Sequence, residues 1–229
     1  IEAVPAGPAR DYGLDRSMIL GYGHDDRVCA YASLEALFGL EEVPEYTCCC
    51  LMADKEEIGS VGATGMRAMY FENAMAELLN LTEENYSDLM LRHALANSRM
   101  LSCDVSAGFD PLFAGAFEKK NAAILGNGVC FNKFTGSGGK SGSNDANAEY
   151  IGKLRKIMDD HQIAWQTAEL GRVDVGGGGT IAYVCALYGM EVIDSGVAVL
   201  SMHAPLEVIN KADLYEAVKA YAAFMKDAK

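Results

Sequence analysis

Acidic and imidazole side chains follow three apolar runs of this sequence, in a pattern that suits chemistry on metal ions. The pair Glu56 and Glu57 follows the first run, Asp104 follows the second, and His203 follows the third. If the three runs are strands of one sheet, their carboxyl ends are where an α/β protein gathers its active-site residues. Taken alone, each acid is typical of a solvated loop end, and His203 of a hydrogen-bonded histidine. Their joint placement favours a functional site.

A pair of divalent cations is commonly held by one carboxylate that bridges them and by terminal Asp, Glu or His ligands. Asp25, Glu57, Asp104 and His203 supply residues of these types. Glu56 remains beside Glu57, and neighbouring side chains of a turn diverge, so one carboxylate can bind a metal while the other accepts a proton from water. These residue types are therefore suited to a hydrolytic two-metal site, with solvated loop-end charges as the alternative. No Gly-x-Ser-x-Gly elbow is present, which disfavours a serine hydrolase.

These residues need a sheet and helices to hold them, and the patterns along the chain predict both. Helical periodicity covers residues 28–40, 66–81, 83–97, about 145–161, 180–188 and 211–225. Apolar runs typical of strands cover residues 47–53, 99–103, 122–131 and 192–201. The first twenty residues are expected to be extended chain and turns, and residues 135–143 a flexible Gly/Ser loop. Strands that alternate with helices predict an α/β sandwich with a mostly parallel or mixed sheet.

Composition limits the kinds of partner. The 229 residues are 50% apolar, which is enough for the core of one domain. A net charge of −13 disfavours nucleic acid as a partner, and the chain has no apolar run long enough to span a membrane. The seven cysteines form no Cys-x-x-Cys pair. We expect them to be buried free thiols in a reducing cytoplasm.

Several segments resemble the aspartyl aminopeptidase family of dizinc exopeptidases. The segments, in chain order, are HDDRVCAYASLEAL (24–37), DKEEIGSVGATG (54–65), LSCDVS (101–106), VDVGGGGTIA (173–182) and LSMHAPLEV (200–208). Their order and spacing match from near residue 5 to the end of the chain. The resemblance implies a three-layer α/β/α sandwich of the zinc-exopeptidase type and a metal-dependent aminopeptidase that hydrolyses the N-terminal residue of peptides.

The resemblance also implies a role for each candidate residue. Asp25 matches the carboxylate that bridges both metals, and Glu56 matches the general base. Glu57 and His203 match the terminal ligands of one metal, and Asp104 matches a ligand of the other. The implied cofactors are two divalent ions, zinc first, with cobalt or manganese as alternatives.

One implied ligand is missing from the sequence. The family places a further histidine in a His-Thr-Asp motif far upstream, and His24, His93 and His161 do not match its context. We therefore expect residues 1–229 to be a single domain, the C-terminal portion of a catalytic domain, without its upstream portion and inserted dimerisation domain. The alternative is a catalytically incomplete fragment or assembly module.

The implied substrate residues match less completely. Lys133 corresponds to a substrate-binding lysine, and Gly178 and Gly179 belong to a glycine run whose backbone N–H groups can approach a substrate carbonyl or carboxylate. Ala107 stands where the family has a substrate-contacting histidine, so the sequence predicts aminopeptidase action but does not predict which N-terminal residue is preferred. The resemblance further implies a homo-oligomer, a tetrahedral dodecamer.

Overall fold

The chain forms two main sheets and a separate hairpin. In the computed structural model, residues 1, 3–138, 141–172 and 174–229 are described. The first sheet has the order β1 (Arg10–Tyr12), β2 (Met18–Gly21), β11 (Glu207–Asn210), β10 (Ala198–Leu200) and β4 (Ser106–Ala107). The second has the order β3 (Arg99–Ser102), β9 (Glu191–Gly196), β5 (Val129–Asn132) and β8 (Trp165–Thr167). The hairpin pairs β6 (Phe134–Ser137) with β7 (Ser141–Asp145).

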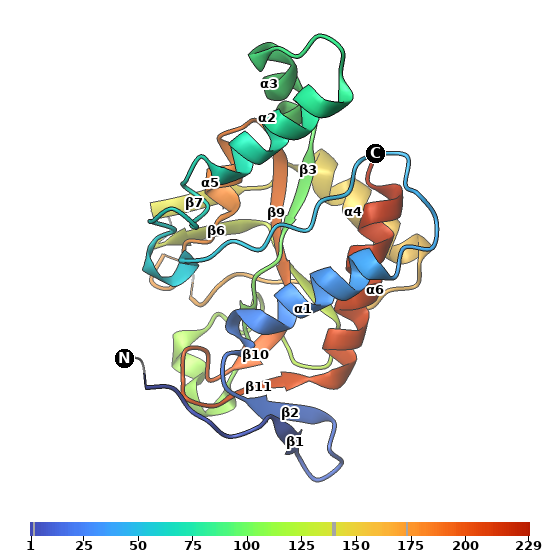
Figure 1. Cartoon of the computed structure of the whole chain (residues 1–229). Coiled ribbons are helices and arrows are strands. Elements are labelled where there is room, and N and C mark those ends of the chain that lie inside the picture. Colours follow the sequence, from blue (N-terminus) through green and yellow to red (C-terminus); the bar gives the residue numbers. More distant parts are fainter. Residues whose placement is uncertain (2, 139–140, 173) are drawn as a thin grey trace.

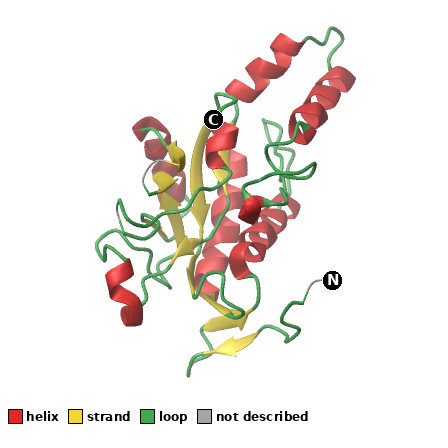
Figure 2. Ribbon diagram, turned by 90° about the vertical axis from the view of Figure 1, so that its left-hand side faces the viewer, coloured by secondary structure: helices red, strands yellow, loops and turns green. Residues whose placement is uncertain are grey.

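Both sheets mix parallel and antiparallel pairs. In the second sheet, β3 pairs parallel with β9 and β5 parallel with β8, while β5 and β9 are antiparallel. In the first sheet, β10 pairs parallel with β4 and antiparallel with β11. Strands β9 and β10 are one run of chain interrupted at Val197, so this run contributes to both sheets. Most of the strands lie between helices (Figure 2), whereas β1 is exposed, and this arrangement confirms the predicted α/β class with mixed sheets.

The helices cover the sheets and complete the core. They are α1 (His24–Phe38), α2 (Tyr70–Thr82), α3 (Asp88–Ala96), α4 (Ala148–Asp160), α5 (Ala182–Ala186) and α6 (Lys211–Asp227), with short 3₁₀ turns η1 (Glu56–Ile58) and η2 (Pro111–Ala116). Helix α1 packs along α6 (Figure 1) and buries the face formed by Val28, Cys29, Ala32 and Ala36. The largest core cluster joins this face to Tyr221 of α6 and to the strands. The packing of α1 fixes where its first turn lies.

A second core cluster lies under the pair α2 and α3, which projects from the body of the molecule (Figure 1). Leu91 and Leu95 of α3 pack there with Met66 and with Val192 of β9. The amphipathic periodicity of residues 66–97 thus predicts both helices, although each begins several residues later than expected. Among the described helices, none combines the length and apolar character needed to cross a membrane.

Residues 47–53 are not the strand that their apolar run predicts. They form no ladder and pass the C-terminal end of α6, where the Cys48 thiol donates to the carbonyl oxygen of Met225 (Sγ–O 3.3 Å). Leu51 and Ala53 pack against the second core cluster. Partial burial of residues such as Leu51 and Ala53 therefore accounts for part of the apolar run, whereas Cys49 and Met52 are exposed.

Three further segments differ from their predicted structure. Residues 10–21 form the β1–β2 hairpin, and β5 covers only the end of the run 122–131, because Gly126 and Gly128 adopt positive φ angles of 89° and 87°. The predicted flexible loop 135–143 contributes to the β6–β7 hairpin, with residues 139–140 outside the described part of the chain. The helix predicted over 180–188 is shortened to the five residues of α5.

The seven cysteines are free thiols, as predicted. Cys29, Cys130 and Cys185 are buried, and three more are half-buried. Cys49 is exposed, so the expectation of burial is wrong for this residue.

Candidate metal centre

Three of the predicted ligands converge on one point. Asp25 in the first turn of α1, Glu57 in η1 and His203 after β10 place a ligand atom each within 4.8 Å of one another. His203 Nε2 lies 2.9 Å from Asp25 Oδ2 and 3.4 Å from Glu57 Oε2. The Asp25 side chain is only 7% exposed, whereas those of Glu57 and His203 are 58% and 62% exposed. The group therefore has one buried member and two members that reach it from the surface.

The backbone at these positions is bent to present the side chains. Glu57 lies in a 3₁₀ turn that starts after Lys55 (φ 68°) and is closed by a hydrogen bond from Gly59 N to Glu56 O of 2.8 Å. His203 also has a positive φ angle, 65°. A non-glycine residue in this region costs energy and needs support from its surroundings. Glu56 and Glu57 were expected to follow a strand, and they follow an irregular segment instead.

A second group consists of carboxylates alone. Asp25, Asp26 and Asp104 also place oxygen atoms within 4.8 Å of one another. Asp104 follows β3, and its carbonyl oxygen lies against Gly196 of β9, where a Cβ atom would come within 1.9 Å. Glycine at position 196 therefore allows β9 to approach the segment that carries Asp104. Asp25 belongs to both groups, which is the arrangement expected of a bridging ligand.

The carboxylates of this acidic cluster (Asp25, Asp26, Glu56 and Asp104) have raised pKa values. Burial is the main cause in all four cases, and repulsion between neighbouring acids adds to it. The pKa of Asp25 rises to about 6, that of Glu56 to about 7 and that of Asp26 to about 8. The pKa of Asp104 lies well above its usual value. Four half-buried acids that disfavour one another's charge are stabilised by a cation among them.

The donor set fits divalent zinc. Carboxylate oxygens and one imidazole nitrogen are ligands that zinc accepts. In addition, Asp26 Oδ1 is buried without a hydrogen-bond partner among the described residues. Residues Asp25, Glu57 and His203 are the ones that would hold an ion at the first group, and Asp25 with Asp104 at the second. The second group contains no imidazole from the described part of the chain.

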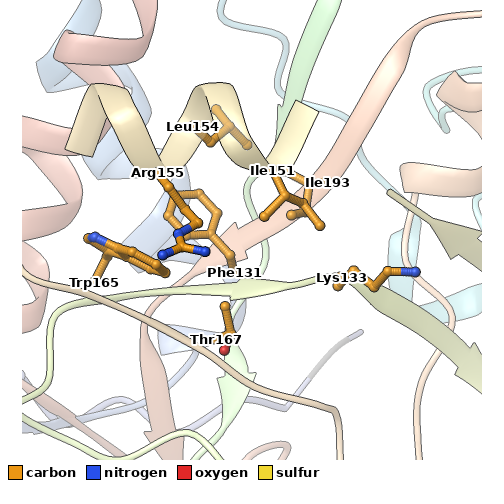
Figure 3. A pocket seen from close by; sticks show the side chains of 8 residues that line it. All are labelled: Phe131, Lys133, Ile151, Leu154, Arg155, Trp165, Thr167 and Ile193. Atoms are coloured by element: carbon orange, nitrogen blue, oxygen red, sulfur yellow. The ribbon is translucent and has the colours of Figure 1, made fainter. Parts of the chain in front are cut away.

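The predicted substrate residues lie beside β5 and the β6–β7 hairpin. Lys133 follows β5 and forms an ion pair with Asp145, and its amine points away from the apolar side chains of the pocket beside α4 (Figure 3). Gly178 and Gly179 belong to the glycine run before α5, and Gly179 lies beside Gly142 of the hairpin. No hydrogen bond or ion pair of the described residues joins these three to the acidic cluster.

The glycine run is pressed against the hairpin. Gly138 N donates to Gly176 O at 3.2 Å, and a Cβ atom on Gly177 would lie 2.2 Å from Gly136 O. Glycine is thus required at position 177 for this close approach, since its φ angle is also 103°. The close packing against the hairpin therefore explains why glycines occur in this run, whether or not they also contact substrate.

Two buried acids near the site were not predicted. Glu207 is 2% exposed and Asp194 is 1% exposed, and the hydroxyl of Thr135 donates to Asp194 Oδ2 at 3.1 Å. Burial raises the pKa of Asp194 to about 6. The sequence does contain a pattern that could have indicated them, because Asp194 is the single acid in the apolar segment 192–201 and Glu207 the single acid in the segment 206–209. A charged residue in a buried strand needs a partner, and this argument would have singled out both.

The comparison with known families decides the relationship. A family described as "Aminopeptidase I zinc metalloprotease (M18)" matches residues 1–225. The chain belongs to the M18 family of aminopeptidases. The resemblance to aspartyl aminopeptidases is thereby confirmed at the level of the family.

Individual M18 relatives agree with this. A probable M18 family aminopeptidase 1 from Clostridium acetobutylicum is 57% identical over 99% of this chain and 48% of its own length. The crystal structure of a Thermotoga maritima M18 aminopeptidase superposes with a TM-score of 0.93 at 43% identity, over 98% of this chain and 49% of that one. The aminopeptidase I structure from Clostridium acetobutylicum gives a TM-score of 0.88 over 97% of this chain and 47% of that one. The chain thus spans about half the length of the M18 relatives that it matches.

Proposed function

We propose that this chain carries the metal-binding part of an M18 aminopeptidase that removes the N-terminal residue of peptides. The observation that carries the proposal is the convergence of Asp25, Glu57 and His203, from three separate segments, in a chain of this family. The family description as zinc metalloproteases supports zinc as the metal. The alternative of a non-catalytic module is less favoured, because these ligand side chains remain grouped as a metal site requires.

The ligand assignment extends this proposal to two ions. Asp25 would contribute to both ions, Glu57 and His203 would complete the ligand set of one, and Asp104 would contribute to the other. The presence of Asp25 in both groups of ligand atoms supports this division. Two carboxylates make a poor zinc site without an imidazole. We propose that the imidazole for the second ion comes from outside these 229 residues, as part of the same catalytic domain, and the partial match to longer relatives supports this.

Glu56 is the proposed general base. Divalent cations bound at such a site act as Lewis acids toward a carbonyl oxygen and make water more acidic. Glu56 accepts the proton of the attacking water and delivers it to the amine that leaves. In the absence of metal, burial and the neighbouring acids raise the pKa of its carboxyl group to about 7.

Lys133, Gly178 and Gly179 remain proposed substrate contacts, supported by the family resemblance of the segments around them. A homo-oligomer is also proposed. A yeast mApe1, 21% identical to this chain, is described as a dodecamer. The proposed compartment is the cytoplasm, and the free thiols of all seven cysteines agree with a reducing environment.

Substitution of the two neighbouring glutamates separates their roles. Glu56→Gln should lower peptidase activity by about 10²–10⁴-fold with zinc content unchanged, because the amide keeps the shape of the side chain but accepts no proton. Glu57→Gln should instead lower zinc content. Both variants are made in the product of the complete gene and assayed on aminoacyl-anilides, with zinc measured by elemental analysis. Loss of zinc in Glu56→Gln and its retention in Glu57→Gln would reverse the assignment.

A further inference from the structure

A single buried carboxylate connects the two segments that carry Asp25 and His203. Glu207, at the start of β11, is 2% exposed. Its Oε2 accepts a hydrogen bond from the backbone N–H of Asp25 (N–O 2.9 Å), and its Oε1 accepts one from the backbone N–H of His203 (N–O 2.8 Å). The two donors lie 182 and 4 residues away from Glu207 in the sequence. Each oxygen of the carboxylate therefore holds one candidate ligand by its own backbone.

These hydrogen bonds fix the backbone of Asp25 and His203, and the position of that backbone determines where the two side chains meet. The side chains of Asp25 and His203 meet at 2.9 Å, although one begins a helix and the other lies in a loop after β10. His203 has a φ angle of 65°, a conformation that a non-glycine residue keeps only with support from its surroundings. The hydrogen bond from its N–H to Glu207 supplies part of this support. A carboxylate acceptor strengthens both bonds because the acceptor is charged.

The first sheet in turn holds Glu207 in place. Strand β11 pairs with β2, where Glu207 lies opposite Gly21, and with β10 on its other side. The carboxylate thus projects from a paired strand rather than from a loop. Sites built on regular elements hold their geometry more closely than sites built on loops.

We propose that Glu207 is a positioning residue that fixes Asp25 and His203 for metal binding and so raises the affinity of the site for zinc. The inference rests on the proposed metal site. Glu207 itself contacts neither the metal nor the substrate in this account. It acts through the backbone of the two ligand residues, and it holds them in place before an ion binds.

Asp213 provides a matched control within the same chain. Its carboxylate is also fully buried and also accepts two backbone hydrogen bonds, from Gly126 N (2.8 Å) and Gly128 N (2.7 Å). Neither glycine carries a candidate ligand. Glu207→Gln and Asp213→Asn each place an NH₂ group where an oxygen accepted from a backbone N–H, so both disturb a comparable pair of bonds. Only the first should disturb the zinc site.

The test measures zinc affinity by competition with a chromophoric chelator, on the product of the complete gene. Glu207→Gln should weaken zinc binding by about 10–100-fold, the usual cost of removing a group that orients a ligand. Asp213→Asn should leave the affinity within about twofold of the wild type, because the two amides that Asp213 holds belong to residues that carry no candidate ligand. Equal losses in both variants, or a wild-type affinity in Glu207→Gln, would overturn the proposal.

The charge of Glu207 is tested separately. Glu207→Asp keeps the negative charge but shortens the side chain by one methylene, so the carboxylate no longer spans both amides. The proposal predicts that this variant also loses at least about tenfold in zinc affinity. Retention of wild-type affinity would show that Glu207 acts by its charge alone and would contradict a positioning role.

Hydrogen exchange gives a result even where the variants fail to fold. In the metal-free wild type, the amides of Asp25 and His203 should be protected from exchange, because Glu207 already accepts from them. Exchange at the rate of open loops, with protection only after zinc is added, would show that the metal orders the ligands without help from Glu207. If the wild type binds no zinc, the proposed metal site fails, whereas protection of these amides would still stand.

Discussion

Acids with raised pKa values occur in two regions of this molecule, and the main interactions that accompany their burial differ. Asp213 is fully buried, and burial raises its pKa, but two backbone N–H groups hydrogen-bond to the carboxylate and oppose the shift. In the acidic cluster, burial also raises the pKa of Asp26 and Asp104, and the charges of neighbouring acids raise it further. Asp213 has the donors that stabilise a buried charge. The acidic cluster gathers charges that oppose one another.

Whether a buried acid is surrounded by hydrogen-bond donors or by other acids distinguishes an acid with a structural role from a candidate functional one. A buried carboxylate with its hydrogen bonds satisfied contributes to the fold and needs no ligand. Several carboxylates buried against one another carry a free-energy cost that only a cation or protons remove. Burial or a raised pKa alone does not identify a metal site. We propose that the convergence of like charges with an imidazole marks such a site here, and membership of a zinc metalloprotease family supports the proposal.

The largest predicted effect tests whether the imidazole beside the acidic cluster differs from an ordinary surface histidine. His203→Ala should weaken zinc binding by at least about 100-fold, more than the loss of an orienting group costs. The control is His161→Ala, since His161 also lies beside a carboxylate (Nε2 to Asp227 Oδ2, 2.6 Å) but has no further acid in a candidate metal group. Zinc competition assays on both variants decide it. Equal affinities for the two variants would remove the distinction.

The free energy of unfolding should change in opposite directions when an acid is neutralised in each of the two regions. This effect is smaller than the loss of zinc affinity in His203→Ala. In metal-free protein at pH 9, above the pKa of about 8 of Asp26, Asp26→Asn should increase the free energy of unfolding by about 1 kcal/mol, because it removes a charge that its neighbours repel. Asp213→Asn should decrease it by about 1–3 kcal/mol, because the new NH₂ group faces a backbone donor. Urea unfolding after treatment with a chelator measures both. Destabilisation by both substitutions would mean that the acidic cluster is satisfied without a cation.

The part of the fold that depends on local periodicity could be predicted from the sequence. Residues 28–40 and 211–225 were expected to be helices, and α1 and α6 occupy His24–Phe38 and Lys211–Asp227. Residues 47–53 show the limit of this reasoning. Their apolar side chains are used in packing, and whether the backbone pairs depends on which strands are available nearby, which the local pattern does not contain.

In the candidate site, too, some residues could be predicted from the sequence and others could be found only in the folded structure. The convergence of Asp25, Glu57 and His203 was expected from their types and from the family resemblance, and the structure brings them together. Glu207 could not be found in that way, because it bonds to a backbone N–H 182 residues away, and any residue can supply such a donor. Residue types reveal ligands, whereas the groups that orient ligands through the backbone become visible only in the folded structure.

Calorimetric titration of zinc into metal-free protein, with wild type and Asp25→Asn measured side by side, tests the central claim most directly. Asp25 is the one residue common to both groups of ligand atoms, so the claim that the acidic cluster is a cation site depends on it more than on any other residue. The account predicts tight zinc binding by the wild type and an affinity at least about 100-fold lower in Asp25→Asn. Equal affinities, or no binding by the wild type, would contradict it.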